Sequence, residues 1–131
     1  MPYTSSYAES FIGKTLIKPE SYDLICKITD ATGTHKWRLK HYQSCCESVG
    51  FHSSIGNWPA GPIVAATFEE GADLPQWLVG KWEALEYGSH TWTVLTLSDG
   101  TDTISIAYLG ESNGYYSEDV TLEYWMEDET K

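Results

Sequence analysis

Two alternating segments joined by an Asp-Gly pair constrain the C-terminal half of the chain. Residues 91–97 and 103–109 both alternate apolar and polar side chains, the period-two pattern of a half-buried strand. Asp99-Gly100 lies between them and is typical of a β-hairpin turn, because both residues tolerate positive φ. The segment therefore predicts an antiparallel hairpin. Within the first strand Trp92, Val94 and Thr96 are expected to share a face, and within the second strand Ile104, Ile106 and Tyr108 are expected to share a face.

A second hairpin is predicted near the N-terminus. Residues 23–29 and 35–42 flank the turn-forming sequence from Asp30 to Gly33. Each strand shows one apolar face, and in the second strand a row of basic residues forms the opposite face, which we expect to meet solvent or to protect a sheet edge. The apolar faces are Leu24, Cys26 and Ile28, then Trp37, Leu39 and His41; the basic row is Lys36, Arg38 and Lys40.

Other segments are less regular. Ser5-Ser6 followed by Glu9 resembles a capping box and predicts a short helix over residues 6–13. Residues 45–55 fit either a strand or a turn, and residues 77–87 either a strand or a short helix. Expected strands are residues 63–68 and the segment containing Val120, Leu122 and Tyr124; expected loops are 55–62 and 69–75, with an acidic tail over 126–131.

These elements predict one α+β, mainly β, domain spanning residues 1–131. We expect a twisted antiparallel sheet of about five to seven strands with one or two short helices. The N-terminal residues lack the pattern of a signal peptide, and no apolar run is long enough to span a membrane. Three cysteines, Cys26, Cys45 and Cys46, are an odd number and favour a reducing compartment. The expected location is the cytoplasm, without a membrane partner.

The net charge is −11 and is unevenly distributed. Residues 1–40 hold six basic and four acidic residues, a net +2, whereas residues 41–131 hold two basic and fifteen acidic residues, a net −13. Such a surface repels phosphate backbones, so direct nucleic-acid binding is not expected. Two interpretations stay open: the acid engages a basic partner, or it only keeps the protein soluble.

The densest group of chemically active residues runs from His41 to Glu47 and includes Cys45 and Cys46. On a strand the two cysteines would point to opposite faces, so zinc binding is not expected. A Cys–His enzyme would need a base, and the positions of His41, His52 and His90 do not single one out. The carboxylate pairs Glu69/Glu70 and Glu118/Asp119 are expected in solvated loops. We therefore expect no catalytic residue, metal or cofactor.

The run Gly110–Glu118 is the most specific motif. Asn113-Gly114 would close a hairpin, and the surrounding hydroxyl and aromatic side chains suit recognition of a polar ligand or a protein loop. The alternative is a hairpin whose Asn and Ser side chains satisfy only the turn. The candidate binding residues, including the loop acids, are Glu69, Glu70, Glu111, Ser112, Asn113, Tyr115, Tyr116, Ser117, Glu118 and Asp119.

Two motifs carry a family resemblance: Gln43-Ser44-Cys45-Cys46-Glu47-Ser48-Val49 and the segment from Gly110 to Val120. With Gly61-Pro62-Ile63 and Thr91-Trp92-Thr93 between them, the chain resembles a family of small, uncharacterised phage and prophage proteins over roughly residues 20–125. The resemblance implies a phage accessory protein in the cytoplasm of an infected host. Such proteins often inhibit host defence, so it also implies an anti-CRISPR or anti-restriction role by association.

Three functions follow from these observations. The leading hypothesis is a non-enzymatic inhibitor that presents acidic residues, Glu123 among them, to a host protein that handles nucleic acid. The first alternative is a binder of a nucleotide signal, whose phosphate would meet Lys36, Arg38 and Lys40. A further alternative is a metal- or thiol-dependent enzyme built on residues 41–47. Sheet edges and six tryptophans also make a homodimer possible.

Overall fold

The computed structural model describes residues 4–20, 26–84, 88–114 and 116–127. A short helix, α1 (Thr4–Glu9), precedes the strands, and a single 3₁₀ turn, η1 (Gln76–Leu78), lies between β4 and β5. The strands are β1 (Cys26–Asp30), β2 (Gly33–Lys40), β3 (Ser48–Gly56), β4 (Ala65–Ala72), β5 (Ser89–Ser98), β6 (Thr103–Ser112) and β7 (Thr121–Glu127).

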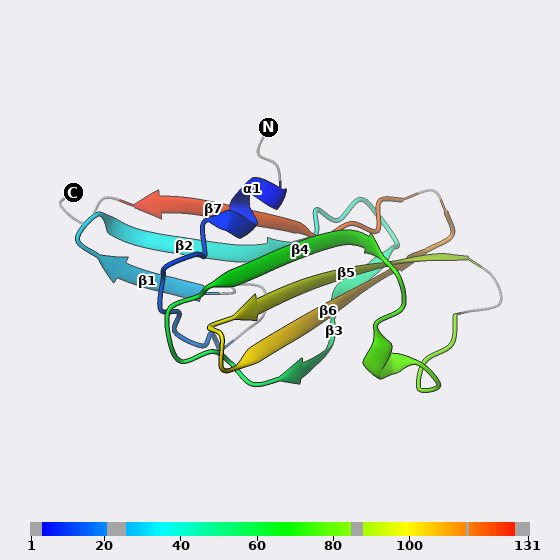
Figure 1. Ribbon diagram of the computed structural model, residues 1–131. Coiled ribbons are helices and arrows are strands. Elements are labelled where there is room, and N and C mark those ends of the chain that lie inside the picture. The colour runs from blue at the N-terminus through cyan, green and yellow to red at the C-terminus, as the bar shows by residue number, and fades with distance from the viewer. Residues whose placement is uncertain (1–3, 21–25, 85–87, 115, 128–131) are drawn as a thin grey trace.

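These strands form two antiparallel sheets (Figure 1). One sheet has the order β1-β2-β7 and the other β3-β6-β5-β4. Side chains from both sheets meet in one buried cluster, so the architecture is a β-sandwich. The mainly β, antiparallel prediction is confirmed, and the strands divide between two layers.

The core lies between the two sheets. Trp37 from β2 is fully buried and stacks on Phe11, with 5.0 Å between the ring centroids. Its indole nitrogen donates a hydrogen bond of 2.6 Å to the Ser10 hydroxyl. The buried N–H group therefore has a hydrogen-bond partner. The segment after α1 thereby covers one side of the core. The opposing sheet contributes Leu95, Leu97, Ile104, Ile106 and Tyr108.

Both sequence-predicted hairpins are present. β1 pairs with β2 across the turn from Asp30 to Gly33, and β5 pairs with β6 across the turn containing Asp99-Gly100. Buried Trp37 and Leu39 alternate with the basic row, as their spacing predicts. Residues 21–25, the start of the first expected strand, lie outside the described residues.

Several boundaries differ from the sequence prediction. The helix ends at Glu9 rather than residue 13, because residues 10–12 make i→i−3 hydrogen bonds that tighten the chain into turns. The ambiguous residues 45–55 mostly form β3, and residues 77–87 begin with η1. The expected tail begins inside β7, which reaches Glu127; residues 128–131 lie outside the described part.

The expected loop over residues 69–75 is the clearest error. Glu69 and Glu70 belong to β4, which pairs with β5 through Ala72. Strand pairing outweighs the poor β-propensity of Glu and Gly here, because β5 supplies partners for the backbone. A register shift between Glu70 and Ala72 accommodates Gly71.

A second apolar cluster covers the other face of the four-stranded sheet. Trp92 and Ala107 are buried there beneath Leu78 of η1, with Trp77 and Trp82 packed around them. Residues 76–82 therefore act as a cover for β5 and β6. Among the described residues, no helix is long and apolar enough to cross a membrane.

The two sheets are connected by a pair of adjacent chain crossings. β2 pairs with β7 in one sheet, while β3, which follows β2, pairs with β6, which precedes β7, in the other. Residues 41–47 and the described residues of 113–120 therefore pass between the sheets together, forming a corner of the sandwich. We refer to these two segments as the corner segments.

The turn between β5 and β6 yields a test of the fold. One Asp99 carboxylate oxygen accepts hydrogen bonds from the backbone N–H groups of Thr101 and Asp102, at 2.8 and 2.7 Å. The other accepts from Gly61 N–H at 2.9 Å. Bonds from Asp102, Gly61 and Thr101 lower the pKa of Asp99 to about 2.

Because the folded pKa lies below the ordinary 3.8, this stabilisation is present above pH 4 and is lost as the pH falls towards 2. We expect Asp99→Asn to lower the thermal unfolding midpoint at pH 7 and to flatten its decline between about pH 4 and 2. Asp102→Asn, which alters a carboxylate of the same turn, is the control and should keep the wild-type decline. Equal pH profiles for all three proteins would contradict the assignment.

Candidate functional site

The two corner segments contain both motifs that stood out in the sequence. Residues 41–47 include Cys45-Cys46-Glu47, and residues 113–120 include most of the Gly110–Glu118 motif. They are bound together by His41, whose Nδ1 lies 2.7 Å from the backbone oxygen of Asp119. The motifs are thus neighbours in space, although about seventy positions separate them in the sequence.

Glu47 organises the first corner segment. Its side chain is fully buried, and its carboxylate accepts hydrogen bonds from the backbone N–H groups of Ser44 and Cys45, both at 2.9 Å. Burial opposes its ionisation, but these bonds and the contact with His41 prevail and lower the pKa of Glu47 to about 2. Glu47 is therefore a permanent internal anion at neutral pH.

His41 joins this anion to the second segment. Its Nε2 lies 2.7 Å from the Glu47 carboxylate, while Nδ1 faces the Asp119 carbonyl. The ring of His41 therefore bridges the carboxylate of one corner segment and the backbone of the other. Gln43 adds hydrogen bonds from its amide to the carbonyl oxygens of Cys45 and Glu47, at 3.1 and 2.7 Å.

Glu118 has a similar role in the second segment. This buried carboxylate accepts hydrogen bonds from the hydroxyls of Ser89 and Thr91 on β5 and of Ser112 on β6. Ser89 and Thr91 are two residues apart on a strand and so face the same side. Burial raises the pKa of Glu118, but bonds from the three hydroxyls outweigh it, and the net shift is downward.

Gly110 allows Glu118 to pack against β6. A Cβ atom at this position would lie 2.3 Å from the backbone oxygen of Glu118 and 2.8 Å from its Cβ. The hairpin expected at Asn113-Gly114 under both interpretations of the motif is wrong, because β6 and β7 lie in different sheets. The glycine at the start of the motif serves close packing of the corner, and Ser112 serves as a ligand of Glu118.

Four of the predicted binding residues line one surface cavity of about 250 Å³. Cys46 and Ser48 complete its wall, so this cavity is where side chains of the two motifs meet at the surface. Ser117 and Asp119 are exposed on the second corner segment, while Tyr115 lies outside the described residues. The four residues are Glu111, Ser112, Asn113 and Tyr116.

The acidic candidates do not form a single patch. Glu69 and Glu70 are consecutive on β4, so their side chains point to opposite faces of the sheet. Glu118 is buried. Glu123 forms an ion pair with the guanidinium of Arg38 and accepts a hydrogen bond from the Tyr42 hydroxyl. Glu70 remains near Asp119: burial and then the Asp119 charge raise the pKa of Glu70.

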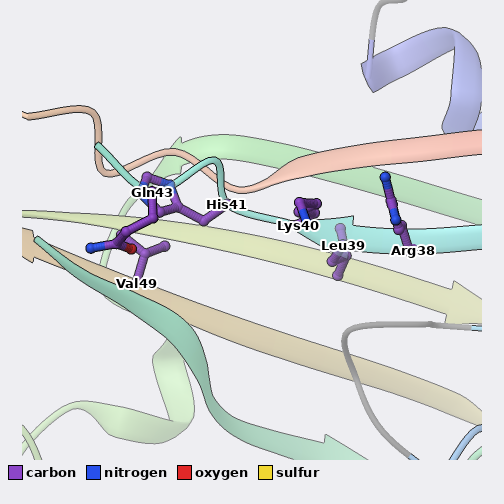
Figure 2. A pocket seen from close by; sticks show the side chains of 6 residues that line it. All are labelled: Arg38, Leu39, Lys40, His41, Gln43 and Val49. Carbon is purple, nitrogen blue, oxygen red and sulfur yellow. The ribbon is translucent and has the colours of Figure 1, made fainter. Parts of the chain in front are cut away.

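A second cavity, also of about 250 Å³, lies beside the end of β2 (Figure 2). Arg38 and Lys40 come from the basic row, and His41 and Gln43 from the first corner segment. Leu39 and Val49 give the cavity an apolar part. Its positively charged lining contrasts with the net charge of the chain.

Cys45 and Cys46 are not the free thiols that a reducing compartment would favour. The sulfur atoms of Cys45 and Cys46 are joined in a disulfide. These residues lie in a bend rather than on a strand, so their side chains do not alternate between faces. Among the described residues, no group of three His, Cys, Asp or Glu side chains is placed to hold a metal ion.

The fold and the corner define a class: an antiparallel β-sandwich in which a buried carboxylate, Glu47, is linked through His41 to the neighbouring inter-sheet crossing. The chain belongs to the family described as domain of unknown function DUF7448, which matches residues 9–122 and so includes both corner segments. No curated protein and no solved structure matches the chain.

Sequence reasoning missed the partners of Glu47 and Glu118. His41 and Glu47 were grouped as possible metal or catalytic residues, whereas they bind each other and the backbone. The sequence does place Ser89 and Thr91 two residues apart, so that their hydroxyls lie on one face of a strand that continues into core residues. Nothing local in the sequence pairs them with Glu118.

Replacing Gly110 tests the packing of the second corner segment. Gly110→Ala should destabilise the protein by about 1–3 kcal/mol, because the added methyl group overlaps the backbone of residue 118. Gly50→Ala is the matched control: it is also a strand glycine, and its Cβ would meet nothing within 4 Å. Urea unfolding of both variants measures the difference, and equal midpoints would show that Gly110 is not tightly packed.

Replacing Glu47 tests the first corner segment. Glu47→Gln removes the charge that holds two N–H groups and His41, so the thermal midpoint at pH 7 should fall. Wild-type protein should lose this contribution as the pH drops from about 4.5 towards 2, because the folded pKa is depressed. The variant should lack that part of the acid transition. Glu69→Gln, on exposed β4, should behave as wild type at both ends.

Proposed function

We propose that this protein is a non-enzymatic binding protein that recognises a basic surface on another protein. The observation that carries the proposal is the like-charged pair Glu70 and Asp119. Both side chains are exposed, and partial burial together with the neighbouring Asp119 charge raises the pKa of Glu70, so the two carboxylates repel each other. Within the described residues, neither carboxylate has a basic side chain in an ion pair. A lysine or arginine from a partner would relieve this repulsion.

The distribution of the remaining charge supports the same proposal. Glu47 and Glu118 accept internal hydrogen bonds, and Glu123 forms an ion pair with Arg38. The chain as a whole still carries −11, so a basic partner would be attracted at long range as well as at contact. Electrostatic attraction of this kind mainly accelerates association.

The non-enzymatic part rests on how the reactive side chains are used. His41 and Glu47 are bound to each other and to the backbone, and Glu118 accepts three hydroxyls. These contacts stabilise the corner and occupy most of the hydrogen-bonding capacity of these groups. The resemblance to phage and prophage proteins supports a specific target: a host protein of a nucleic-acid-handling defence system, met in the cytoplasm.

A pull-down of the tagged chain from bacterial lysate, at low and high salt with mass spectrometry, tests this proposal. We expect a stoichiometric protein partner that is lost at high salt. Glu70→Gln combined with Asp119→Asn should weaken its measured affinity at least about tenfold, or about 1.4 kcal/mol. Glu83→Gln combined with Asp73→Asn removes the same charge at two other exposed positions and should bind as wild type. Binding that ignores salt, or equal loss in both double variants, would contradict the proposal.

A further inference from the structure

We propose that the outer face of the three-stranded sheet binds a single strand of nucleic acid. The face, here called the basic face, consists of Lys27 on β1, Lys36, Arg38 and Lys40 on β2, and Trp125 on β7. These residues point away from the core, because they alternate with buried Trp37 and Leu39 or lie directly opposite residues that do. This inference goes beyond the proposed protein-binding function and does not depend on it.

The strand register gathers positive charge on this face. Lys27 is directly opposite Lys36, and Lys36 is directly opposite Trp125 on the other side. Like charges at directly opposed positions disfavour strand pairing. Glu123 offsets one charge through its pair with Arg38. The register thus places Lys27, Lys36, Arg38 and Lys40 on one face of the sheet, where a polyanion could contact several cations at once.

Aromatic rings accompany the cations. The Arg38 guanidinium carbon lies 5.3 Å from the centroid of the Trp125 ring, and the Lys40 nitrogen lies 5.5 Å from that of Tyr42. Such contacts hold the cations against the sheet. Single-strand-binding surfaces combine a basic track for the backbone with aromatic and guanidinium planes on which bases stack. Both features are present on this face.

The geometry favours a single strand over a duplex or a mononucleotide. Lys36, Arg38 and Lys40 are successive outward positions on one strand and span about 13 Å in a straight row. A flat sheet face offers no helix or loop to enter a duplex groove. A mononucleotide could occupy the adjacent cavity lined by Arg38, Lys40 and His41 (Figure 2), but Lys27 and Lys36 do not line that cavity and would not contact it.

The net charge of −11 argues against binding to nucleic acid in general, but the basic face has the opposite local sign. At about 0.1 M salt, charges beyond about 10 Å are largely screened. An extended strand lying on the basic face therefore experiences mainly the nearby lysines and Arg38. A duplex, with its wider phosphate array, would also meet acidic regions.

Fluorescence anisotropy with a labelled oligothymidylate and the full chain tests the inference. We expect salt-dependent binding, weakened at least about tenfold in a Lys27→Gln, Lys36→Gln, Lys40→Gln triple variant. Its log–log salt slope should fall by about 2, the value for three lost single-strand phosphate contacts. Arg38 is left unchanged so that Glu123 keeps its partner. The control variant Lys14→Gln, Lys18→Gln, Lys81→Gln removes the same charge elsewhere and should bind as wild type.

Thermal unfolding of both triple variants confirms that they are folded before binding is compared. No binding by wild type, equal loss in both variants, equal affinity for duplex DNA, or full displacement by a mononucleotide would each overturn the inference. The Glu70→Gln, Asp119→Asn variant should bind the oligonucleotide at least as well as wild type. Loss of the protein partner with retained oligonucleotide binding therefore separates failure of the proposed function from failure of this inference.

Discussion

Two neighbouring chain segments must leave one sheet and enter the other at the same corner. Within a sheet, backbone N–H and C=O groups pair along the ladder, but residues 41–47 and 113–120 lie outside it. Glu47 accepts two of the N–H groups, and Gln43 donates to two of the carbonyls. His41 then joins this segment to the Asp119 carbonyl. The relative placement of the two sheets depends on these contacts.

The period-two alternation of residues 91–97 and 103–109 predicted their strands and hairpin because strand formation there is a local property. The partition into two sheets was not predictable in the same way. Asn113-Gly114 is a good turn sequence, yet the strand after it pairs with β2 instead of returning to β6. Whether a turn closes a hairpin or a crossing depends on long-range partners, which local preference does not specify.

The candidate site shows the same division. The structure brings Glu111, Ser112, Asn113 and Tyr116, which the sequence places in one motif, to the wall of one cavity. It separates Glu69 from Glu70, because the loop assignment hid the alternation of a strand. Glu118 was expected to be solvated, yet three hydroxyls from β5 and β6 make its burial favourable. A buried acid and an exposed acid look alike in sequence when their partners are distant.

The internal use of carboxylates also changes how the net charge is understood. Glu47 and Glu118 are structural anions, and Glu123 is paired with Arg38 of the basic face. Fewer acidic side chains are therefore available at the surface than the composition suggests. The molecule consequently presents regions of opposite sign, an acidic pair at the corner and a basic face on the three-stranded sheet. Each region suits a different class of partner.

The pKa of Glu47, measured by a ¹³C NMR titration of its side-chain carboxyl group in the folded protein, tests the central claim most directly. If the corner is held as described, the carboxyl titrates at about 2, because Ser44, Cys45 and His41 stabilise its charged form. A value at or above the ordinary 4.5 would show that this network does not bind the two crossings together.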